Sequence, residues 1–360
     1  MLTTLFVMAG LMFATCCGGL VWFVATAPEG KPSGGGNDLF EIEDVPLPEF
    51  RKYQTAARRQ FRGAELYCIP LGKSRNGHYS TPGHGGSLYY YLPAGKHEPG
   101  SLPCVLITAA GSNLFQGKKF DDIATTEDAA EHLPYVHAGM AVMAYEMDGS
   151  QAFETNSEFK AVHKDFKAAG AGMVNARNAF EYILENCPEV NPQQIFAAGH
   201  SSAGTAALLF AAHEPRLAGC MAYAPVTNLS DFHPPDVYVK LVATMPSLGF
   251  FMTRASPITH VRHIQCPVYI FQTRDDAVVN LKQTNAFVDL LRTTNSQVEM
   301  DTVTFGGHYP GMINDGIPAG ISWINVQIGR AEKRVHAQPH GIRQMPWENE
   351  KTHPSRNMRW

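Results

Sequence analysis

The chain has 360 residues, of which 44% are hydrophobic, and this is enough to bury one large core or two small ones. Its formal net charge at pH 7 is −4 and its body contains no long basic block, which argues against a nucleic-acid-binding protein. Two of the seven cysteines lie in an apolar N-terminal stretch, and the other five lack metal-ligand spacing. We therefore expect buried free thiols, the alternative being one disulfide in an extracytoplasmic body.

The first predicted element is an apolar segment at the N-terminus. No side chain from Leu2 to Ala27 is charged, and at 1.5 Å per residue such a helix crosses the roughly 30 Å hydrocarbon layer. The segment lacks the basic start and short apolar core of a signal peptide, so residues 1–27 are predicted to be an uncleaved transmembrane anchor. The acidic flank favours a single-pass membrane protein with an extracytoplasmic main domain. The alternative is a secreted protein whose signal is cleaved.

The segment that follows, residues 28–62, is predicted to be a linker with a juxtamembrane part. The glycine-rich stretch Lys31–Gly36 is typical of a flexible linker, and Val45–Phe61, which contains prolines, predicts a loop and a short helix. Glu65–Pro70 and Gly86–Pro93 are rich in apolar and aromatic residues and bounded by turn residues, so both are predicted to be strands.

From Pro103 onward, short and mostly apolar runs alternate with longer helical segments. The predicted strands are Cys104–Thr108, Ala141–Tyr145, Ile195–Ala198, Leu217–Tyr223, Pro267–Phe271 and Val298–Phe305. Long helices are predicted at Glu158–Leu184 and Ile317–Arg330. This alternation predicts an α/β fold with a mostly parallel central sheet and helices on both faces. Residues 63–330 are predicted to form this domain, and the polar, proline-containing residues 331–360 a disordered tail.

The stretch Ile195–Gly204, with the sequence IFAAGHSSAG, has the pattern of a nucleophile elbow. An apolar strand ends at a glycine, Ser201 follows, and a helix-forming run begins directly after it, so a sharp turn would expose the serine hydroxyl above the sheet edge. Gly199 and Ala203 flank Ser201 because larger side chains would collide in so tight a bend. Ser202 is the alternative nucleophile, but the register of the strand favours Ser201.

An acid and a histidine follow Ser201 in the order that such chemistry needs. Asp275 and Asp276 come after the strand Pro267–Phe271, and His308 comes after two glycines beyond the last strand. A neutral imidazole can take the proton from a serine hydroxyl, and a buried carboxylate can hold the imidazole in the right tautomer. The order of serine, aspartate and histidine is that of α/β-hydrolases. We expect a catalytic triad.

Two further stretches carry a family resemblance. Ser256–Pro267, with the sequence SPITHVRHIQCP, is similar to the segment that leads the prolyl-oligopeptidase-like group into its acid-bearing strand, and Pro225–Leu229 is similar too. The region Tyr89–Arg330 thus resembles the catalytic domain of α/β-hydrolases, closest to the prolyl-oligopeptidase-like group. The resemblance implies an α/β-hydrolase fold without a propeller, because the stretch before the domain is too short for one.

The resemblance also assigns roles. The nucleophile falls on Ser201, the base on His308 and the acid on Asp276. Asp276 is preferred to Asp275 because Asp276–Val279 matches the family's pattern of Asp, any residue, Val and Val. The function that follows is that of a serine hydrolase.

The chain departs from the family at two places. The family often carries His-Gly after its third strand, where this chain has Ala109–Ser112, and again before the acid, where it has Gln272-Thr273. The first change leaves backbone N–H groups in place. An oxyanion hole is therefore predicted from Ser202 together with either Ser112 or Gly111.

The sequence as a whole predicts a membrane-tethered hydrolase that cleaves an ester or amide bond through an acyl-enzyme, with no metal or organic cofactor. The favoured activity is carboxylesterase-like, on a small or extended ester or peptide substrate. One alternative is a prolyl-oligopeptidase-like peptidase, and a second is a catalytically inactive hydrolase fold used as a binding module. Leu248–Met252 predicts a short helical flap whose Phe250, Phe251 and Met252 either line an acyl pocket or pack on the sheet. The oligomeric state is left open.

Overall fold

The computed structural model describes residues 39–72, 81–120, 123 and 127–337. Met1–Asn37 form a unit separate from Asp38–Trp360, and only the second unit is described below. The predicted anchor at residues 1–27 lies outside the described residues, as do residues 338–360 of the predicted tail. Among the helices of the described segments, none is both long enough and apolar enough to cross a membrane.

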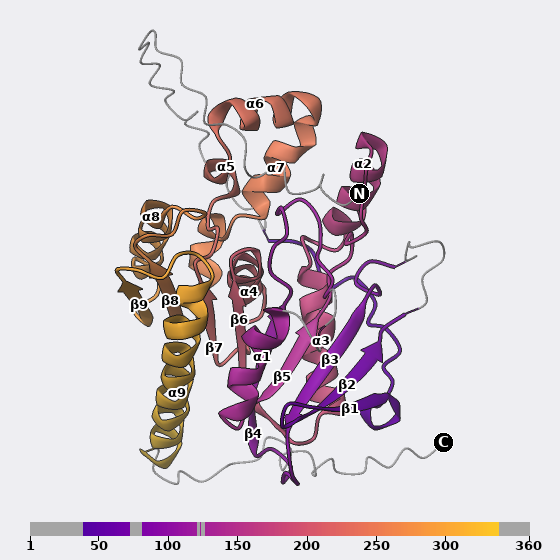
Figure 1. Ribbon diagram of the computed structural model, residues 1–360, viewed down its shortest axis with the longest axis vertical. Coiled ribbons are helices and arrows are strands. Elements are labelled where there is room, and N and C mark those ends of the chain that lie inside the picture. The colour runs from indigo at the N-terminus through magenta and orange to yellow at the C-terminus, as the bar shows by residue number, and fades with distance from the viewer. Residues whose placement is uncertain (1–38, 73–80, 121–122, 124–126, 338–360) are drawn as a thin grey trace, which may run out of the picture. The chain divides into compact units, whose positions relative to one another are not determined.

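A nine-stranded sheet runs through the domain in the order β1-β2-β3-β5-β4-β6-β7-β8-β9 (Figure 1). The strands are β1 (Ala57–Phe61), β2 (Ala64–Pro70), β3 (Ser87–Pro93), β4 (Leu102–Thr108), β5 (Ala141–Tyr145), β6 (Val190–His200), β7 (Gly219–Tyr223), β8 (Val268–Thr273) and β9 (Val298–Val303). The pairings β1–β2, β2–β3 and β3–β5 are antiparallel. The remaining pairings, from β5 across the sheet to β9, are all parallel. The predicted mostly parallel α/β sheet is confirmed.

Helices cover both faces of this sheet. They are α1 (Glu127–His137), α2 (Asn156–Ala168), α3 (Met173–Asn186), α4 (Ser202–His213), α5 (Leu229–Phe232), α6 (Pro235–Thr244), α7 (Pro246–Arg254), α8 (Leu281–Arg292) and α9 (Ile317–Ala337). α1 and α9 pack on one face, while α3, α4 and α8 pack on the other (Figure 1). Each face has its own apolar core because strands buried on both sides direct alternate side chains to opposite faces.

Residues 39–62 belong to the domain, so the predicted linker boundary at residue 62 is wrong. Phe40 and Ile42 are buried in the core, and the Phe40 N–H donates to His213 Nε2 at 3.0 Å. The segment Ala57–Phe61 is strand β1, which pairs with β2, rather than part of a loop and helix. Nearly every residue of β1 is exposed, so the strand shows no apolar alternation and is stabilised by backbone pairing at the sheet edge.

Two predicted helices also have different boundaries in the structure. The single helix predicted at Glu158–Leu184 is divided into α2 and α3, because Gly170 and Gly172 take φ values of 59° and 83° that end a right-handed helix. A side chain at residue 172 would be strained at this φ and would displace the Met147 side chain, since a Cβ there would lie 2.5 Å from Met147 Sδ. α9 continues through residues 331–337, which were predicted to be tail, because glycine and proline are absent from this stretch.

The five cysteines of the described residues are all free thiols, and four of them are buried as predicted. Cys104, Cys187, Cys220 and Cys266 are buried, and Cys68 is half-buried. Burial raises the pKa of each of these thiols, so they are protonated and unreactive at neutral pH.

Candidate active site

Ser201 forms the turn between β6, which ends at His200, and α4, which begins at Ser202. Its φ of 53° and ψ of −119° are strained for a residue with a side chain. The backbone is held there by two hydrogen bonds: the Ser201 N–H donates to the Tyr223 carbonyl at 2.9 Å, and its carbonyl accepts from the Thr205 N–H at 3.0 Å. The chain therefore makes the sharp strand-to-helix turn that a nucleophile elbow requires.

Small residues permit this turn. A Cβ on Gly199 would lie 2.3 Å from the carbonyl carbon and oxygen of Ala203, and a Cβ on Gly204 would lie 2.9 Å from the Gly199 oxygen. Ala203 accommodates its methyl group and is fully buried. The two positions at which no side chain fits are thus Gly199, as expected, and Gly204 rather than Ala203.

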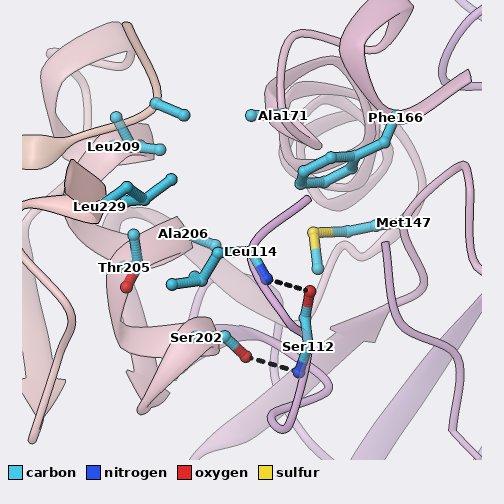
Figure 2. Close-up of a pocket in the computed structure, with 11 residues that line it drawn as sticks. Ser112, Leu114, Met147, Phe166, Ala171, Ser202, Thr205, Ala206, Leu209 and Leu229 are labelled. Carbon is cyan, nitrogen blue, oxygen red and sulfur yellow. Dashed lines mark hydrogen bonds between the residues drawn. The ribbon is translucent and has the colours of Figure 1, made fainter. Parts of the chain in front are cut away.

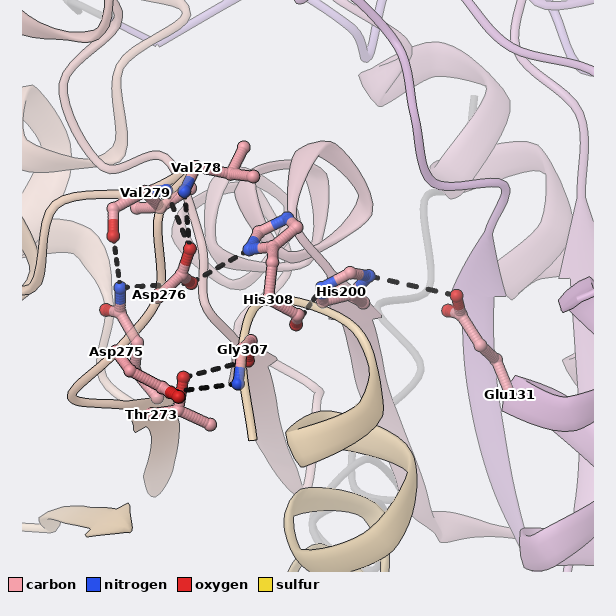
Figure 3. Close-up of polar contacts among 10 residues, drawn as sticks. Glu131, His200, Thr273, Asp275, Asp276, Val278, Val279, Gly307 and His308 are labelled. Carbon is pink, nitrogen blue, oxygen red and sulfur yellow. Dashed lines mark hydrogen bonds and ion pairs between the residues drawn. The ribbon is translucent and has the colours of Figure 1, made fainter. Parts of the chain in front are cut away.

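Asp276 and His308 form a close pair, although they come from different loops (Figure 3). His308 Nδ1 donates to Asp276 Oδ2 at 2.8 Å, and Asp276 Oδ1 accepts the Val278 and Val279 N–H groups at 2.8 and 2.9 Å. Burial would raise the pKa of Asp276, but the hydrogen bonds from His308 and from the two backbone amides outweigh it and hold the pKa below its ordinary value. The carboxylate is therefore ionised and fixes His308 in the tautomer whose Nε2 is free to act as a base.

Asp275 has a different task in the same loop. Its carboxylate accepts the Gly307 N–H at 2.9 Å and the Gly306 N–H at 3.2 Å, and Thr273 Oγ1 donates to the Gly307 carbonyl at 2.8 Å (Figure 3). The two glycines have φ values of 144° and 62°, which favour glycine. Asp275 and Thr273 thus hold the loop that carries His308, a role that the sequence did not reveal.

His200 is a further residue at this site. Its Nε2 donates to the His308 carbonyl at 3.0 Å, the two imidazole rings lie 4.5 Å apart, and its Nδ1 is 3.9 Å from Glu131 Oε1 on α1. Burial, with a smaller contribution from His308, lowers the pKa of His200 to about 3, so the ring is neutral. The signal in the sequence is its position directly before Ser201. Its partners at 131 and 308 are distant in the chain and cannot be found from local pattern.

The predicted oxyanion donors lie together, and their hydrogen bonds distinguish them. Ser202 is the first residue of α4, where backbone N–H groups have no helical acceptor. The Ser112 N–H donates to Ser202 Oγ at 3.0 Å (Figure 2), whereas the Gly111 amide has no partner within the described residues. Gly111 has a φ of 82°. Of the two donors left open by the sequence, Ser112 is already engaged and Gly111 is not.

The predicted flap is helical, but its residues do not line an acyl pocket, which was one of the two expectations. Leu248–Met252 lie within α7, where Phe251 and Met252 are 1% and 0% exposed and belong to the core, while Phe250 is 67% exposed. The cavity beside Ser202 is lined by Leu229 and Ala255 from this part of the chain, and by none of the three flap residues. Phe251 and Met252 thus pack on the body rather than in an acyl pocket, and the exposed Phe250 does neither.

The model of the prolyl oligopeptidase family matches residues 128–322, which is more than half of the chain and includes Ser201, Asp276 and His308. No curated protein sequence matches the chain.

Several solved structures share the fold. The acetyl xylan esterase from Paenibacillus sp. R4 superposes with a TM-score of 0.56 at 15% identity, over 78% of this chain and 89% of that one. Acetyl xylan esterase 1 from Thermoanaerobacterium sp. JW/SL YS485 has a TM-score of 0.54 at 16% identity, over 80% and 90%. A puromycin-hydrolyzing peptidase from Mycobacterium tuberculosis has a TM-score of 0.54 at 15% identity, over 83% and 49%. Given the family match, the chain belongs to the prolyl oligopeptidase family and is a serine hydrolase.

Proposed function

We propose that this protein is an esterase that hydrolyses small or extended esters through an acyl-enzyme on Ser201. The observation that carries the proposal is the 2.8 Å hydrogen bond between an ionised Asp276 and His308, in a domain whose nucleophile turn holds Ser201 at a φ of 53°. In this proposal Ser201 is the nucleophile, His308 the general base and Asp276 the residue that orients the base. Ser202 and Gly111 supply the oxyanion amides.

The geometry supports a two-step reaction. His308 Nε2 takes the proton as Ser201 Oγ bonds to the substrate carbonyl carbon, while Nδ1–H stays on Asp276 and the carboxylate stabilises the imidazolium. The Ser202 and Gly111 N–H groups donate to the oxygen that gains charge. When the resulting tetrahedral intermediate collapses, the bond to the leaving group breaks, and the leaving group takes the proton from His308. Water then attacks the acyl-enzyme with the same proton transfers, and Ser201 is regenerated.

Peptide cleavage is the second candidate, because the family that matches residues 128–322 is named for an oligopeptidase. The fold does not decide between the two, since solved structures that share it carry the names of esterases and of a peptidase. The ester is favoured because, in the part of the chain that the structure describes, the elements inserted between β7 and β8 are the short helices α5, α6 and α7 and the 3₁₀ helix Pro257–His263. They supply no separate domain that would hold the free amino terminus of a peptide.

The test combines active-site labelling with a choice of substrates. A fluorophosphonate probe is expected to label the wild-type protein and not Ser201→Ala. Short-chain p-nitrophenyl esters are expected to be hydrolysed, and dipeptidyl anilides to be cleaved little. Strong cleavage of Pro- or Ala-linked anilides with esters untouched would establish the peptidase instead. A folded protein with neither labelling nor turnover would be the inactive binding module.

We also propose that Leu2–Ala27 anchors the protein in a membrane as a single-pass protein, with the hydrolase domain outside the cytoplasm. The support is the uncharged length of this segment and the glycine-rich stretch after it. The full chain is expected to stay with membranes during carbonate extraction, and a chain that starts near Gly34 is expected to be soluble and active. A mature amino terminus beyond Ala27 would make the protein secreted rather than anchored.

A further inference from the structure

A small cavity lies beside Ser202, on the side of α4 that faces the loop after β4 (Figure 2). Its volume is about 20 Å³, which is room for about one water molecule or one methyl group. Most of its wall is apolar and comes from Leu114, Met147, Phe166, Leu209 and Leu229.

The polar groups on the wall are engaged with other parts of the protein. Ser202 Oγ accepts the Ser112 N–H at 3.0 Å, and Thr205 Oγ1 donates to the Val226 carbonyl at 2.8 Å. The Ser112 hydroxyl donates to the Gln116 carbonyl. With these groups turned to protein partners, the cavity is suited to an apolar group.

The cavity adjoins the oxyanion donors. In the acyl-enzyme of the proposed function, Ser201 Oγ carries the carbonyl carbon, and the Ser202 and Gly111 amides hold the carbonyl oxygen. The wall includes Ser202 itself and Ser112, which directly follows Gly111. Ser201 itself does not line the cavity, so the acyl substituent, which extends from the same carbon, would enter it past Ser202 and Ser112. We infer that the cavity is the acyl pocket and that the enzyme is selective for acetyl esters, an inference that rests on the proposed function.

The size limit follows from packing. Phe166, Met147, Leu209 and Leu229 are 5%, 3%, 2% and 1% exposed and belong to the main apolar core, so they cannot move aside without disturbing their neighbours. The methyl of an acetyl group fits the volume, whereas each further methylene must displace a wall or stay outside, in the open mouth of the cavity. A single methylene in a pocket of fixed size changes kcat/KM by about 10–200-fold.

The experiment measures kcat/KM of the full chain in detergent on p-nitrophenyl acetate, propionate, butyrate and hexanoate. The wild-type value is expected to fall at least about tenfold from acetate to butyrate. Leu209→Ala, which enlarges the cavity, is expected to raise the butyrate-to-acetate ratio at least about tenfold. The matched control is Leu208→Ala: Leu208 is also fully buried on α4 but does not line the cavity, so the ratio should stay at the wild-type value.

Folding and function are read on the same preparations. Thermal melting reports folding, and if Leu209→Ala does not fold, Leu209→Val makes the same comparison with a smaller change. A wild-type profile that is flat from acetate to hexanoate, or equal shifts in both leucine variants, would overturn the acyl pocket. If the fluorophosphonate probe still labels Ser201 in that case, the proposed function stands without the acetyl preference. If the folded wild-type protein shows neither labelling nor ester turnover, the proposed function itself is wrong.

Discussion

His200 holds the backbone of His308: its Nε2 donates to the His308 carbonyl at 3.0 Å, and the two rings lie 4.5 Å apart. Asp276 holds the ring of the same residue through Nδ1 at 2.8 Å. Burial lowers the pKa of His200 to about 3, so its ring is neutral beside the imidazolium that would form on His308 during the reaction. His308, the proposed base, is thus fixed at its backbone and at its ring by two different side chains.

The first prediction is that His200→Leu lowers kcat about 100-fold with a smaller change in KM, because His308 shifts while the substrate contacts remain. His200→Gln, whose amide N–H can replace the Nε2 donor, is expected to retain more of kcat. Steady-state kinetics on p-nitrophenyl acetate measures both. Equal kcat in His200→Leu and the wild type would show that this hydrogen bond does not position the base.

The second prediction separates the two serines of the elbow. Ser201→Ala is expected to abolish turnover and probe labelling. Ser202→Ala is expected only to reduce turnover, because alanine keeps the backbone N–H and loses only the oxygen that accepts from Ser112. The measurement is labelling intensity and kcat in folded protein. Abolished labelling in Ser202→Ala alone would reassign the nucleophile.

The third prediction separates the two aspartates. Asp276→Asn is expected to lower kcat by up to about 10⁴-fold, because an amide at this position favours the wrong tautomer of His308. Asp275→Asn is expected to do much less, since its contacts are the Gly306 and Gly307 amides and an amide oxygen can still accept one of them. Measuring kcat of the two variants side by side shows which aspartate is the acid. Equal losses, or the larger loss at Asp275, would contradict the assignment of the acid.

The elements predicted well from sequence are those encoded locally. Strands β4, β5, β7 and β8 and the second half of β6 are largely apolar runs, and β9 alternates apolar with polar residues. The elbow is marked by Gly199 and by the helix-forming run after Ser201, so these features are visible in a short window. Strand β1 is not visible in this way, because its residues are exposed and its order depends on pairing with β2. The hydrogen bond from the Ser112 N–H to Ser202 Oγ, which favours Gly111 over Ser112 as the proposed oxyanion donor, joins backbone to side chain across 90 positions.

The fourth prediction is a pair of identical substitutions with opposite effects on stability. Gly204→Ala places a Cβ 2.9 Å from the Gly199 oxygen and is expected to lower the free energy of unfolding by about 1–3 kcal/mol. Gly329→Ala, on α9 with no atom within 4 Å of the added Cβ, is expected to raise it by about 0.5–1 kcal/mol. Urea unfolding at neutral pH measures both. Equal changes of the same sign would show that the elbow relaxes around a methyl group.

The last prediction concerns the stability of the fold at acidic pH. Hydrogen bonds from His308 and from the Val278 and Val279 amides hold the pKa of Asp276 below its ordinary value despite burial, so the fold favours the ionised form. A carboxylate with a lowered pKa stabilises the fold fully above its unfolded pKa, about 4, and this contribution is lost as the pH falls through the folded value. The free energy of unfolding of the wild type minus that of Asp276→Asn should therefore be larger at pH 7 than at pH 3. Urea unfolding at both pH values tests this, and the other carboxylates cancel because both proteins contain them. A difference that stays constant or grows on acidification would show that the fold does not favour ionised Asp276.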